Sequence, residues 1–490
     1  MSTGFASTDP DAARYAPGSF EAVDRAIEAG ASAAFSFLER LVAAPSTIGR
    51  EAQAQEIVAA ELTRLGFGVS QVPIPLPTAA RSPGGVAQLS YDGRYDLLGR
   101  LNPGAGPSLL LNGHVDVVPA QAALWSADPF RPVIADGWMS GRGAGDMKGG
   151  FAMALLAVGA LRTAMPGALT GELSFLSVIE EECTGNGTLA ACEAGVLGDT
   201  VVLVEPTGLD LLLGGVGVLW VEIVIDGVSA HAESADRAVN PVRYLPAMLA
   251  ALAALEDEFR ACAADPAFTE VASPYNVNVG TLQAGDWPSS VPGQARLGVR
   301  VGYPRDRTPE EALERVSDAV LAAAAQDPWL AAHPPQVLPA GYRAEGYLLS
   351  SDHPLVTAMS DAHGWAHGAS PRRHVLGSTT DARYYVNQFG RPALAYGPRA
   401  RNIHGADEAV ELASIVAGAR TLARFMARYF AAGGLPGEPD VIRHTEGQAA
   451  GTPDAGTPDA GTPAAGMPAA GTPGSPVAGS PAGGVTGAGE

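Results

Sequence analysis

Histidines and carboxylates follow the short apolar segments of this sequence, and such side chains are the ligands that zinc, cobalt and manganese ions bind in proteins. The candidates, in chain order, are His114, Asp116, Asp146, Glu180, Glu181, Glu182, Glu205 and His404. Two histidines with several carboxylates exceed the three protein ligands of a mononuclear catalytic zinc, and a two-metal site that shares one carboxylate explains the surplus. The candidates extend from position 114 to position 404, which excludes a local finger-type structural site.

Each candidate also has a plainer interpretation. A histidine at a strand end is more often structural, Glu205 stands before a proline and suits a solvated loop, and Asp146 suits the N-cap of a following helix. The HxD spacing of His114 and Asp116 favours the ligand, because a carboxylate two residues on can fix the imidazole tautomer. The glycine-rich segment 141–150 matches neither phosphate-binding loop pattern, so it is not interpreted as a nucleotide site.

The three consecutive glutamates in LSFLSVIEEEC pose an electrostatic problem, since no Lys or Arg is close in sequence. Two carboxylates about 5 Å apart repel by roughly 3 kcal/mol at an effective dielectric constant near 20. In a regular strand, Glu181 would face away from Glu180 and Glu182. Glu181 and Glu182 can therefore face the same metals only if the strand ends by about Glu180, which the following TGNG favours.

Short apolar runs predict the strands that position these ligands, and longer Ala/Leu-rich periodic stretches predict helices. The predicted strands are 109–111, 173–179, 201–204 and 393–396, and the predicted helices are about 20–42, 51–65, 149–162, 240–260, 308–325 and 410–430. Alternation of buried strands and helices indicates an α/β sandwich with a mixed, largely parallel sheet. Functional groups in such sheets gather beyond the carboxyl ends of the strands, where the candidates stand.

The middle section has a different order of predicted elements: strand 218–226, helix 240–260, strands 276–283 and 294–302, helix 308–325 and strand 336–342. This β-α-β-β-α-β order is typical of a ferredoxin-like domain. We expect an inserted domain at 214–345 within a catalytic domain made of 1–213 and 346–435. Residues 436–490 contain repeats such as GTPDA with few large apolar side chains, and we expect them to be disordered.

Composition narrows the classes of partner and compartment. The net charge of −21 argues against nucleic acid or an anionic membrane as partner. Cys183, Cys192 and Cys262 suit a reducing compartment better than a disulfide framework. The N-terminus shows no signal peptide and no run is long enough to span a membrane, so we expect a soluble, cytoplasmic protein.

Several of these segments together resemble a known family. GHVDVVP, GRGAGDMKGG, VIEEECTGNG, VEPTG, GVSAHAES and TDARYY, followed by GP and IHGADE, occur in this order between Gly113 and about Glu408. They resemble the co-catalytic zinc amidohydrolases, a family that includes acetylornithine deacetylase, succinyl-diaminopimelate desuccinylase, aminoacylase and glutamate carboxypeptidase. The resemblance implies a zinc exopeptidase-like catalytic domain, and the inserted domain resembles the lid and dimerisation domain of that family.

The resemblance also implies roles for the ligands. Asp146 would bridge two divalent ions, most often zinc, with cobalt or manganese as alternatives. His114 and Glu205 would complete one metal site, and Glu182 and His404 the other.

The remaining roles follow from the same resemblance. Glu181 would be the general base, and Asp116 would orient His114. His231 would stabilise the oxyanion, commonly in the active site of a partner subunit, which implies a homodimer. The residues implied at the carboxylate end of the substrate are Arg300, Gly377, Ser378 and Thr379.

The function so implied is hydrolysis of the amide bond of an N-acyl amino acid, with deacylation of the acetylornithine or succinyl-diaminopimelate type as first choice. An exopeptidase, either a carboxypeptidase or a dipeptidase acting on short peptides, is the alternative within the class. A non-catalytic metal-binding relative is the alternative from another class. Lys148, the one lysine among 31 basic residues, is interpreted as a packing or charge-balancing residue. The histidines that match no segment are interpreted as structural or solvated: His333, His353, His363, His367, His374 and His444.

Overall fold

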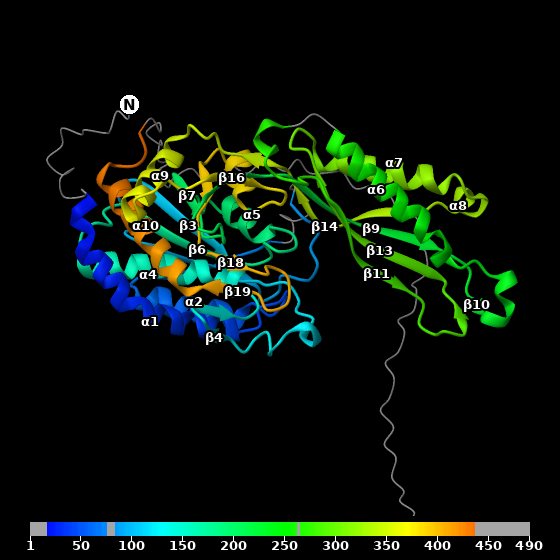
Figure 1. The fold of residues 1–490 in the computed structure, drawn as a ribbon, viewed down its shortest axis with the longest axis horizontal. Coiled ribbons are helices and arrows are strands. Elements are labelled where there is room, and N and C mark those ends of the chain that lie inside the picture. Colours follow the sequence, from blue (N-terminus) through cyan, green and yellow to red (C-terminus); the bar gives the residue numbers. More distant parts are fainter. Residues whose placement is uncertain (1–16, 76–83, 262–264, 437–490) are drawn as a thin grey trace, which may run out of the picture. The chain divides into compact units, whose positions relative to one another are not determined.

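A computed structural model describes residues 17–75, 84–261 and 265–436 (Figure 1). The described residues form two larger sheets, each with its own helices and hydrophobic core. The expectation of a disordered tail at 436–490 concerns residues that lie, from 437 on, outside the described part of the chain.

The larger sheet has nine strands, in the order β1-β2-β6-β3-β7-β17-β8-β15, with β16 paired to β8. Their bounds are β1 Gly68–Pro73, β2 Tyr95–Leu101, β3 Ser108–His114, β6 Glu172–Val178, β7 Thr200–Leu203, β8 Leu211–Gly215, β15 Tyr347–Leu348, β16 Arg373–Leu376 and β17 Ala393–Ala395. The central pairs β3–β6, β3–β7 and β7–β17 are parallel, whereas β1–β2 and β2–β6 are antiparallel. The pairs β17–β8 and β15–β8 are also antiparallel, and β16–β8 is parallel. The predicted mixed sheet is confirmed, with parallel pairs at its centre.

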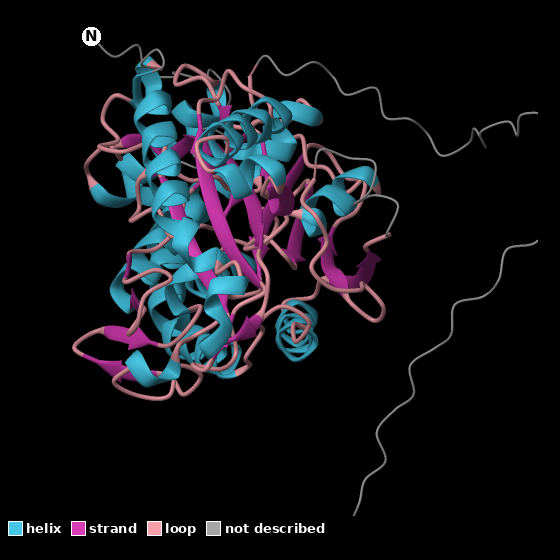
Figure 2. Cartoon of the chain, turned by 90° about the vertical axis from the view of Figure 1, so that its right-hand side faces the viewer, coloured by secondary structure: helices cyan, strands magenta, loops and turns pink. Residues whose placement is uncertain are grey.

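Helices cover both faces of this sheet (Figure 2). They are α1 Glu21–Ala43, α2 Ala52–Arg64, α4 Gly149–Ala164, α5 Asn186–Glu193, α9 Pro354–His367 and α10 Leu412–Ala431. Strand alternation divides the core: Leu109 and Leu111 of β3 lie in the cluster with α1, α4 and α10, and Leu110 lies in the cluster with α5.

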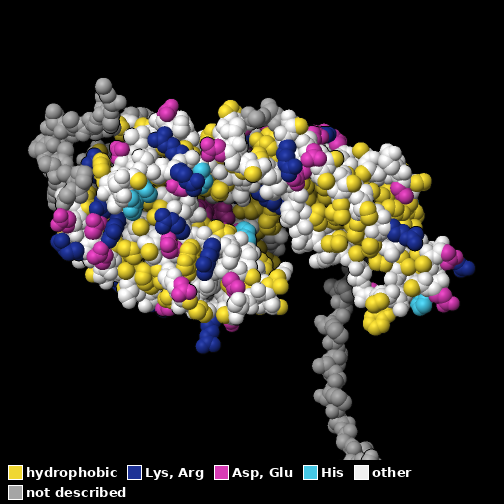
Figure 3. Space-filling model, viewed as in Figure 1, with side chains coloured by type: hydrophobic (Ala, Val, Ile, Leu, Met, Phe, Trp, Pro, Cys, Tyr) yellow, Lys and Arg dark blue, Asp and Glu magenta, His cyan; other side chains and the backbone are white. Residues whose placement is uncertain are grey.

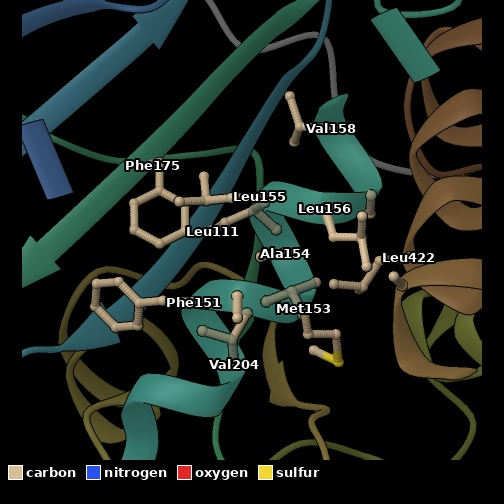
Figure 4. Close-up of a cluster of buried hydrophobic side chains, with 14 of the residues drawn as sticks. Leu111, Phe151, Met153, Ala154, Leu155, Leu156, Val158, Phe175, Val204 and Leu422 are labelled. Atoms are coloured by element: carbon tan, nitrogen blue, oxygen red, sulfur yellow. The ribbon is translucent and has the colours of Figure 1, made fainter. Parts of the chain in front are cut away.

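Helix α4 fills the centre of the larger core. Its side chains Phe151 and Leu155 are buried beside the strand residues Leu111 and Phe175, and the side chain of Met153 lies on the side of α10 (Figure 4). The stretch Ala144–Ala164 is long and apolar enough to cross a membrane by length and composition, yet 89% of its apolar 18-residue window is buried in the fold, as expected for a core helix.

The second sheet has the order β11-β13-β9-β14, and all its pairs are antiparallel. Its strands are β9 Gly217–Asp226, β11 Val277–Ala284, β13 Gln294–Tyr303 and β14 Gln336–Ala344, and its helices are α6 Leu245–Ala261, α7 Pro309–Ala324 and α8 Pro328–Ala332. Element order and strand order are those of a ferredoxin-like fold, as predicted. We call residues 217–344 the inserted part; the predicted domain boundaries at 214 and 345 stay a prediction.

The predicted helix at 240–260 begins later than expected. Residues Pro241–Tyr244 form a 3-10 turn, and α6 starts at Leu245. The Asn240 side chain accepts the N–H of Val242, so the first turn is capped in the tighter form.

Two small sheets and several short turns complete the described fold. The sheet β18-β19-β5-β4 consists of β4 Val133–Ala135, β5 Trp138–Ser140, β18 Ala400–Arg401 and β19 Ala409–Glu411, and β10 Ala230–His231 pairs with β12 Ser290–Val291. The short helical turns are η2 Pro17–Phe20, η3 Ala122–Leu124, η4 Ala144–Lys148, η5 Ala232–Arg237, η6 Pro241–Tyr244, η7 Pro266–Phe268 and η8 Tyr384–Gln388. Pairing of β19 with β5 holds segment 400–411 beside the chain that leads into η4.

Candidate metal centre

The candidate ligands lie where the strands of the larger sheet end. His114 is the last residue of β3, the acidic triplet 180–182 follows β6, and Glu205 follows β7. Asp146 lies in η4, and His404 lies between β18 and β19. Because β6, β3 and β7 are parallel neighbours, their carboxyl ends meet at one edge of the sheet.

A glycine pair brings η4 onto this edge. Gly149 and Gly150 open α4, and a Cβ at Gly150 would lie 1.8 Å from the carbonyl oxygen of Val204. Only a residue without a side chain permits this approach. The helix start therefore rests on the end of β7 and holds Asp146 close to Glu205.

Asp146 lies between the two histidines and presents one carboxylate oxygen to each. Its Oδ1 is 3.0 Å from Nε2 of His114, and its Oδ2 is 3.5 Å from Nε2 of His404. This is the arrangement required of a carboxylate shared by two ions.

A second carboxylate stands beside each histidine. Oε2 of Glu205 is 3.9 Å from Nε2 of His114, and Oε2 of Glu182 is 3.0 Å from Nε2 of His404. Two ligands about 2.1 Å from a tetrahedral zinc would be about 3.4 Å apart. The observed separations of 3.0–3.9 Å lie on both sides of that value, so the donor set fits two divalent ions that share Asp146.

The imidazole of His114 is held by a backbone group. Its Nδ1 lies 3.0 Å from the carbonyl oxygen of Asp116, which can only accept, so Nδ1 carries a proton and Nε2 is the nitrogen that faces the cluster. The Asp116 carboxylate, predicted to hold the imidazole, is 3.8 Å from Nδ1. Instead it accepts the N–H groups of Glu181 and Glu182 at 3.3 and 3.1 Å. The prediction that the Asp116 carboxylate holds the imidazole is therefore wrong, because the backbone carbonyl of Asp116 makes that contact.

The acidic triplet leaves the strand as the sequence predicts. Strand β6 ends at Val178, and Glu180 has the left-handed backbone angle φ = 65°. The turn brings Oε2 of Glu181 to 4.0 Å from Nε2 of His114, while Glu182 reaches His404. Both glutamates therefore face the same cluster.

Glu180 points elsewhere and is fully buried. Its carboxylate accepts from the hydroxyls of Tyr91 and Thr184 and from Nη1 of Arg94, at 2.6, 2.8 and 2.6 Å. Arg94 also pairs with the buried carboxylate of Glu51. The cation that offsets Glu180 is thus Arg94, which directly precedes β2 and stands 86 positions earlier in the chain.

Excess negative charge is concentrated in the cluster. Burial and the carboxylates of Asp146 and Glu182 raise the pKa of Glu205 to about 8, and burial also raises the pKa of Glu181 well above its usual value. The Glu182 carboxylate raises the pKa of His404 to about 11. Divalent cations are the groups that offset such a buried set of carboxylates.

A buried ion pair ties together the two loops that carry Asp146 and His404. Oε1 of Glu408 accepts the N–H groups of Gly145 and Asp146 at 2.9 Å each, and its other oxygen pairs with Arg142. Nη2 of Arg142 donates to the carbonyl oxygen of His404 at 3.3 Å. Sequence reasoning missed this pair, although Arg142 and Glu408 lie inside the segments GRGAGDMKGG and IHGADE.

Lys148 is a packing residue, in agreement with its interpretation from the sequence. Its ammonium group is buried and donates to the carbonyl oxygens of Leu41 and Ala44 at 2.9 and 3.0 Å, at the end of α1. Burial lowers its pKa to about 7. Lys148 therefore joins the loop of Asp146 to the C-terminus of α1.

A cleft of about 840 Å³ opens on the candidate ligands, between the edge of the larger sheet and the inserted part. Figure 3 shows acidic side chains in the hollow between these two regions. The apolar side chains that line the cleft are Pro206, Leu212, Val218, Trp220, Val221, Val299, Leu376 and Ile403. A large, mostly apolar group can be held beside the cluster.

Most of the predicted substrate residues lie at this cleft. Arg300, Ser378 and Thr379 line it, and Nη2 of Arg300 donates to the carbonyl oxygen of Gly377 at 2.9 Å. The other terminal nitrogen of Arg300 bonds to Asn276. Among the described residues, the buried hydroxyl of Thr379 has no hydrogen-bond partner.

His374 also lines the cleft, which corrects its interpretation as a structural or solvated residue. It lies on β16, and no segment of the sequence marks it. Of the remaining histidines in the described chain, His333 stacks on Trp329, His353 caps α9, and His363 and His367 lie in a network with Tyr396 and Thr421. His444 lies outside the described residues.

His231 does not join the cluster within one chain. It is exposed on β10, at the end of the inserted part remote from β3 and β6 (Figure 1), and its Nδ1 accepts the N–H of Glu233. Its implied action in a partner subunit stays a prediction.

The sequence of the chain matches a known family. Residues 110–428 match the family described as Peptidase family M20/M25/M40. The matched range contains all six candidate metal and base residues.

The chain is also similar to individual proteins of known name. The chain is 28% identical over 415 residues to succinyl-diaminopimelate desuccinylase of Rhodopseudomonas palustris, a match that covers 81% of this chain and 98% of the relative. It is 26% identical over 338 residues to N-formyl-4-amino-5-aminomethyl-2-methylpyrimidine deformylase of Halalkalibacterium halodurans, which covers 65% and 78%. The fold is similar to that of the dipeptidase Dug1p from Saccharomyces cerevisiae, with a TM-score of 0.69 and 17% identity over 85% of this chain and 99% of that one.

Proposed function

The chain belongs to Peptidase family M20/M25/M40, and from this premise we propose that it is a two-metal amidohydrolase that cleaves N-acyl amino acids. One observation carries the proposal: the carboxylate of Asp146 presents one oxygen to His114 and the other to His404. Glu205 and Glu182 stand beside these histidines, so each half of the cluster offers three donors.

The ions fit this donor set. His114, Asp146 and Glu205 would hold one ion, and Asp146, Glu182 and His404 the other. Carboxylate and imidazole donors in this number suit zinc, with cobalt or manganese as alternatives. When bound, two such ions supply the Lewis acidity that lowers the pKa of a water molecule and polarises an amide carbonyl.

Glu181 moves the proton in this proposal. Its carboxylate faces the cluster, next to His114, and takes a proton from the attacking water. As the C–N bond breaks, it gives this proton to the leaving nitrogen, so that the products are a carboxylic acid and an amine. Burial raises the pKa of Glu181, which suits a group that must both accept and release a proton.

The cleft limits the choice of substrate. Arg300 can pair with a substrate carboxylate at the wall formed by Ser378 and Thr379, as the family resemblance implies. The similarity to a desuccinylase supports an N-acyl amino acid. The apolar wall around Trp220 favours substrates with a large apolar acyl group or side chain.

Two other substrate types remain in the proposal as alternatives. A dipeptide is supported by the similarity of the fold to Dug1p. An N-formyl amine on an aromatic ring is supported by the similarity to the deformylase and by Trp220, whose ring can pack against an aromatic substrate. We also propose a cytoplasmic homodimer, formed through the inserted part, in which His231 reaches the active site of the partner.

A hydrolysis screen tests this proposal. The chain, loaded with Zn²⁺ or Co²⁺, is offered N-acetyl, N-succinyl and N-formyl amino acids, an N-formyl aminomethylpyrimidine and dipeptides, and release of the amine is measured. We expect turnover that Glu181→Gln lowers by several orders of magnitude, to a small residual rate, while the metal content stays near two ions per chain. Absence of metal-dependent turnover on every compound, or equal turnover by Glu181→Gln, would overturn the proposed function.

A further inference from the structure

The general base has a hydrogen-bond partner from the inserted part. The hydroxyl of Tyr342 donates to Oε2 of Glu181 at 3.2 Å, and both residues are 7% exposed. Tyr342 lies on β14 and Glu181 follows β6, so the bond joins the two sheets. No segment that marks the family in the sequence contains Tyr342.

Among the described residues, this is the one hydrogen bond that the carboxylate of Glu181 accepts. Nε2 of His114 is 4.0 Å away, beyond hydrogen-bond range. The carboxylates of Glu182 and Glu205 repel it. A glutamate has three side-chain torsions, so a carboxylate that accepts no hydrogen bond can occupy several rotamers.

The ring of Tyr342 is itself held firmly. Trp220 packs edge-on against it, with centroids 5.4 Å apart and an interplanar angle of 80°. The guanidinium carbon of Arg383 lies 5.2 Å from the ring centroid, and Nη2 of Arg383 reaches the carbonyl oxygen of Thr184 at 3.4 Å. The same arginine thus touches the tyrosine and the turn that carries the base.

The backbone around Tyr342 is also hydrogen-bonded to residues outside the inserted part. The N–H of Val86 donates to the carbonyl oxygen of Gly341 at 2.8 Å, and the side-chain amide of Gln88 donates to that of Ala340 at 3.1 Å. Gly341 has φ = 155°, and a Cβ there would lie 2.4 Å from the ring of Trp220. The absence of a side chain at Gly341 therefore allows β14 to pass close to Trp220 and to place Tyr342 beside Glu181.

We propose that Tyr342 is a positioning residue that holds the carboxylate of Glu181 toward the cleft, and that the inserted part thereby sets the geometry of the base. The inference rests on the proposed function insofar as Glu181 is the base. A hydroxyl that donates to a carboxylate forms a charge-assisted hydrogen bond, and at 3.2 Å this one is longer than the usual O–H···O range. Its loss lets the base occupy orientations from which it cannot reach the attacking water.

Tyr342→Phe tests the proposal, because it removes the hydroxyl and keeps the ring against Trp220 and Arg383. The matched control is Tyr303→Phe: Tyr303 is also buried in the inserted part, and its hydroxyl donates to the carbonyl oxygen of Ala344 at 2.7 Å, on the same strand as Tyr342. The control loses a comparable hydrogen bond that does not touch the base.

We expect Tyr342→Phe to lower kcat about ten- to hundredfold, with KM and metal content near those of Tyr303→Phe. In the Glu181→Gln background the same change should have no further effect on kcat, because the group that it positions is gone. A crystal structure of Tyr342→Phe should show the Glu181 carboxylate displaced or in more than one orientation.

Two results would overturn the inference. One is a kcat for Tyr342→Phe equal to that of Tyr303→Phe with Glu181 in its original place. The other is a full additional loss in the Glu181→Gln background, which would mean that Tyr342 acts on the substrate. If the wild-type chain hydrolyses no amide, the proposed function fails, but the crystal structure still decides whether Tyr342 holds Glu181.

Discussion

The carboxylate of Glu408 accepts the backbone N–H of Asp146 at 2.9 Å, and its second oxygen pairs with Arg142. Because Arg142 also donates to the carbonyl oxygen of His404, one buried ion pair holds the two loops that carry Asp146 and His404. Groups that fix the ligands of a metal matter for its affinity although they do not touch the ion.

We therefore expect Glu408→Gln to weaken metal binding about 10- to 100-fold, because a neutral amide cannot offset Arg142 and presents one acceptor where Glu408 has two. Competition with a coloured chelator measures the affinity. Glu411→Gln, three positions on and paired at the surface with Arg399, is the control and should bind metal as the wild type does. Equal affinity of Glu408→Gln and wild type would show that the pair does not position the ligands.

Arg94 lies between the buried carboxylates of Glu51 and Glu180. Arg94→Met should lower the free energy of unfolding by about 3–5 kcal/mol, because it leaves two buried carboxylates without their cation. Urea unfolding with metal present measures it. Arg64→Met removes an exposed pair with Glu61 and should cost no more than about 1 kcal/mol. A similar small loss for both variants would contradict this account of the triplet's first glutamate.

The His363–His367 network gives a pH-dependent stability. Burial, followed by the charges of His363 and neighbouring arginines, lowers the pKa of His367 to about 4, against about 6.5 in an unfolded chain. Between these values the unfolded state binds more protons, so the contribution is complete above pH 6.5 and is lost as the pH falls toward 4.

We expect the wild type to lose more stability than His367→Gln between pH 6.5 and 4, since the variant has no imidazole to protonate at this position. Comparing the two removes effects of the metal cluster, which both share. His333→Gln changes an exposed imidazole and should follow the wild type. Parallel curves for wild type and His367→Gln would refute the assignment.

His231 offers a test of the proposed dimer. His231→Ala should lower kcat with metal content unchanged, because the side chain is remote from the ligands of its own chain. Mixed with Glu181→Gln, it should regain part of the activity, since one site of a mixed dimer then has an intact base and an intact partner histidine. Loss of activity without any recovery on mixing would argue against a role across subunits.

Local sequence predicted which side chains gather at the candidate metal centre, because each stands next to a strand end or a glycine turn. The turn after β6 is an example: TGNG predicted that the strand stops, and the φ of Glu180 shows that it does. The partners of these residues could not be predicted, because they come from distant parts of the chain. Arg94 for Glu180, Glu408 for Asp146 and Tyr342 for Glu181 are set by packing.

The sequence also could not predict whether the carboxylate or the backbone carbonyl of Asp116 contacts His114. The spacing of His114 and Asp116 predicts a contact, but two N–H groups of the acidic turn occupy the carboxylate, and the carbonyl oxygen holds the imidazole instead. His374 was missed for a related reason, because its place at the cleft depends on the parallel pairing of β16 with β8.

The central claim is that Asp146 is shared by two ions, and an anomalous difference map at the zinc edge, from a crystal of the zinc-loaded chain, tests it most directly. The account predicts two peaks, one beside the Asp146 oxygen that faces His114 and Glu205, and one beside the oxygen that faces His404 and Glu182. A single peak, or two peaks of which only one contacts Asp146, would contradict it.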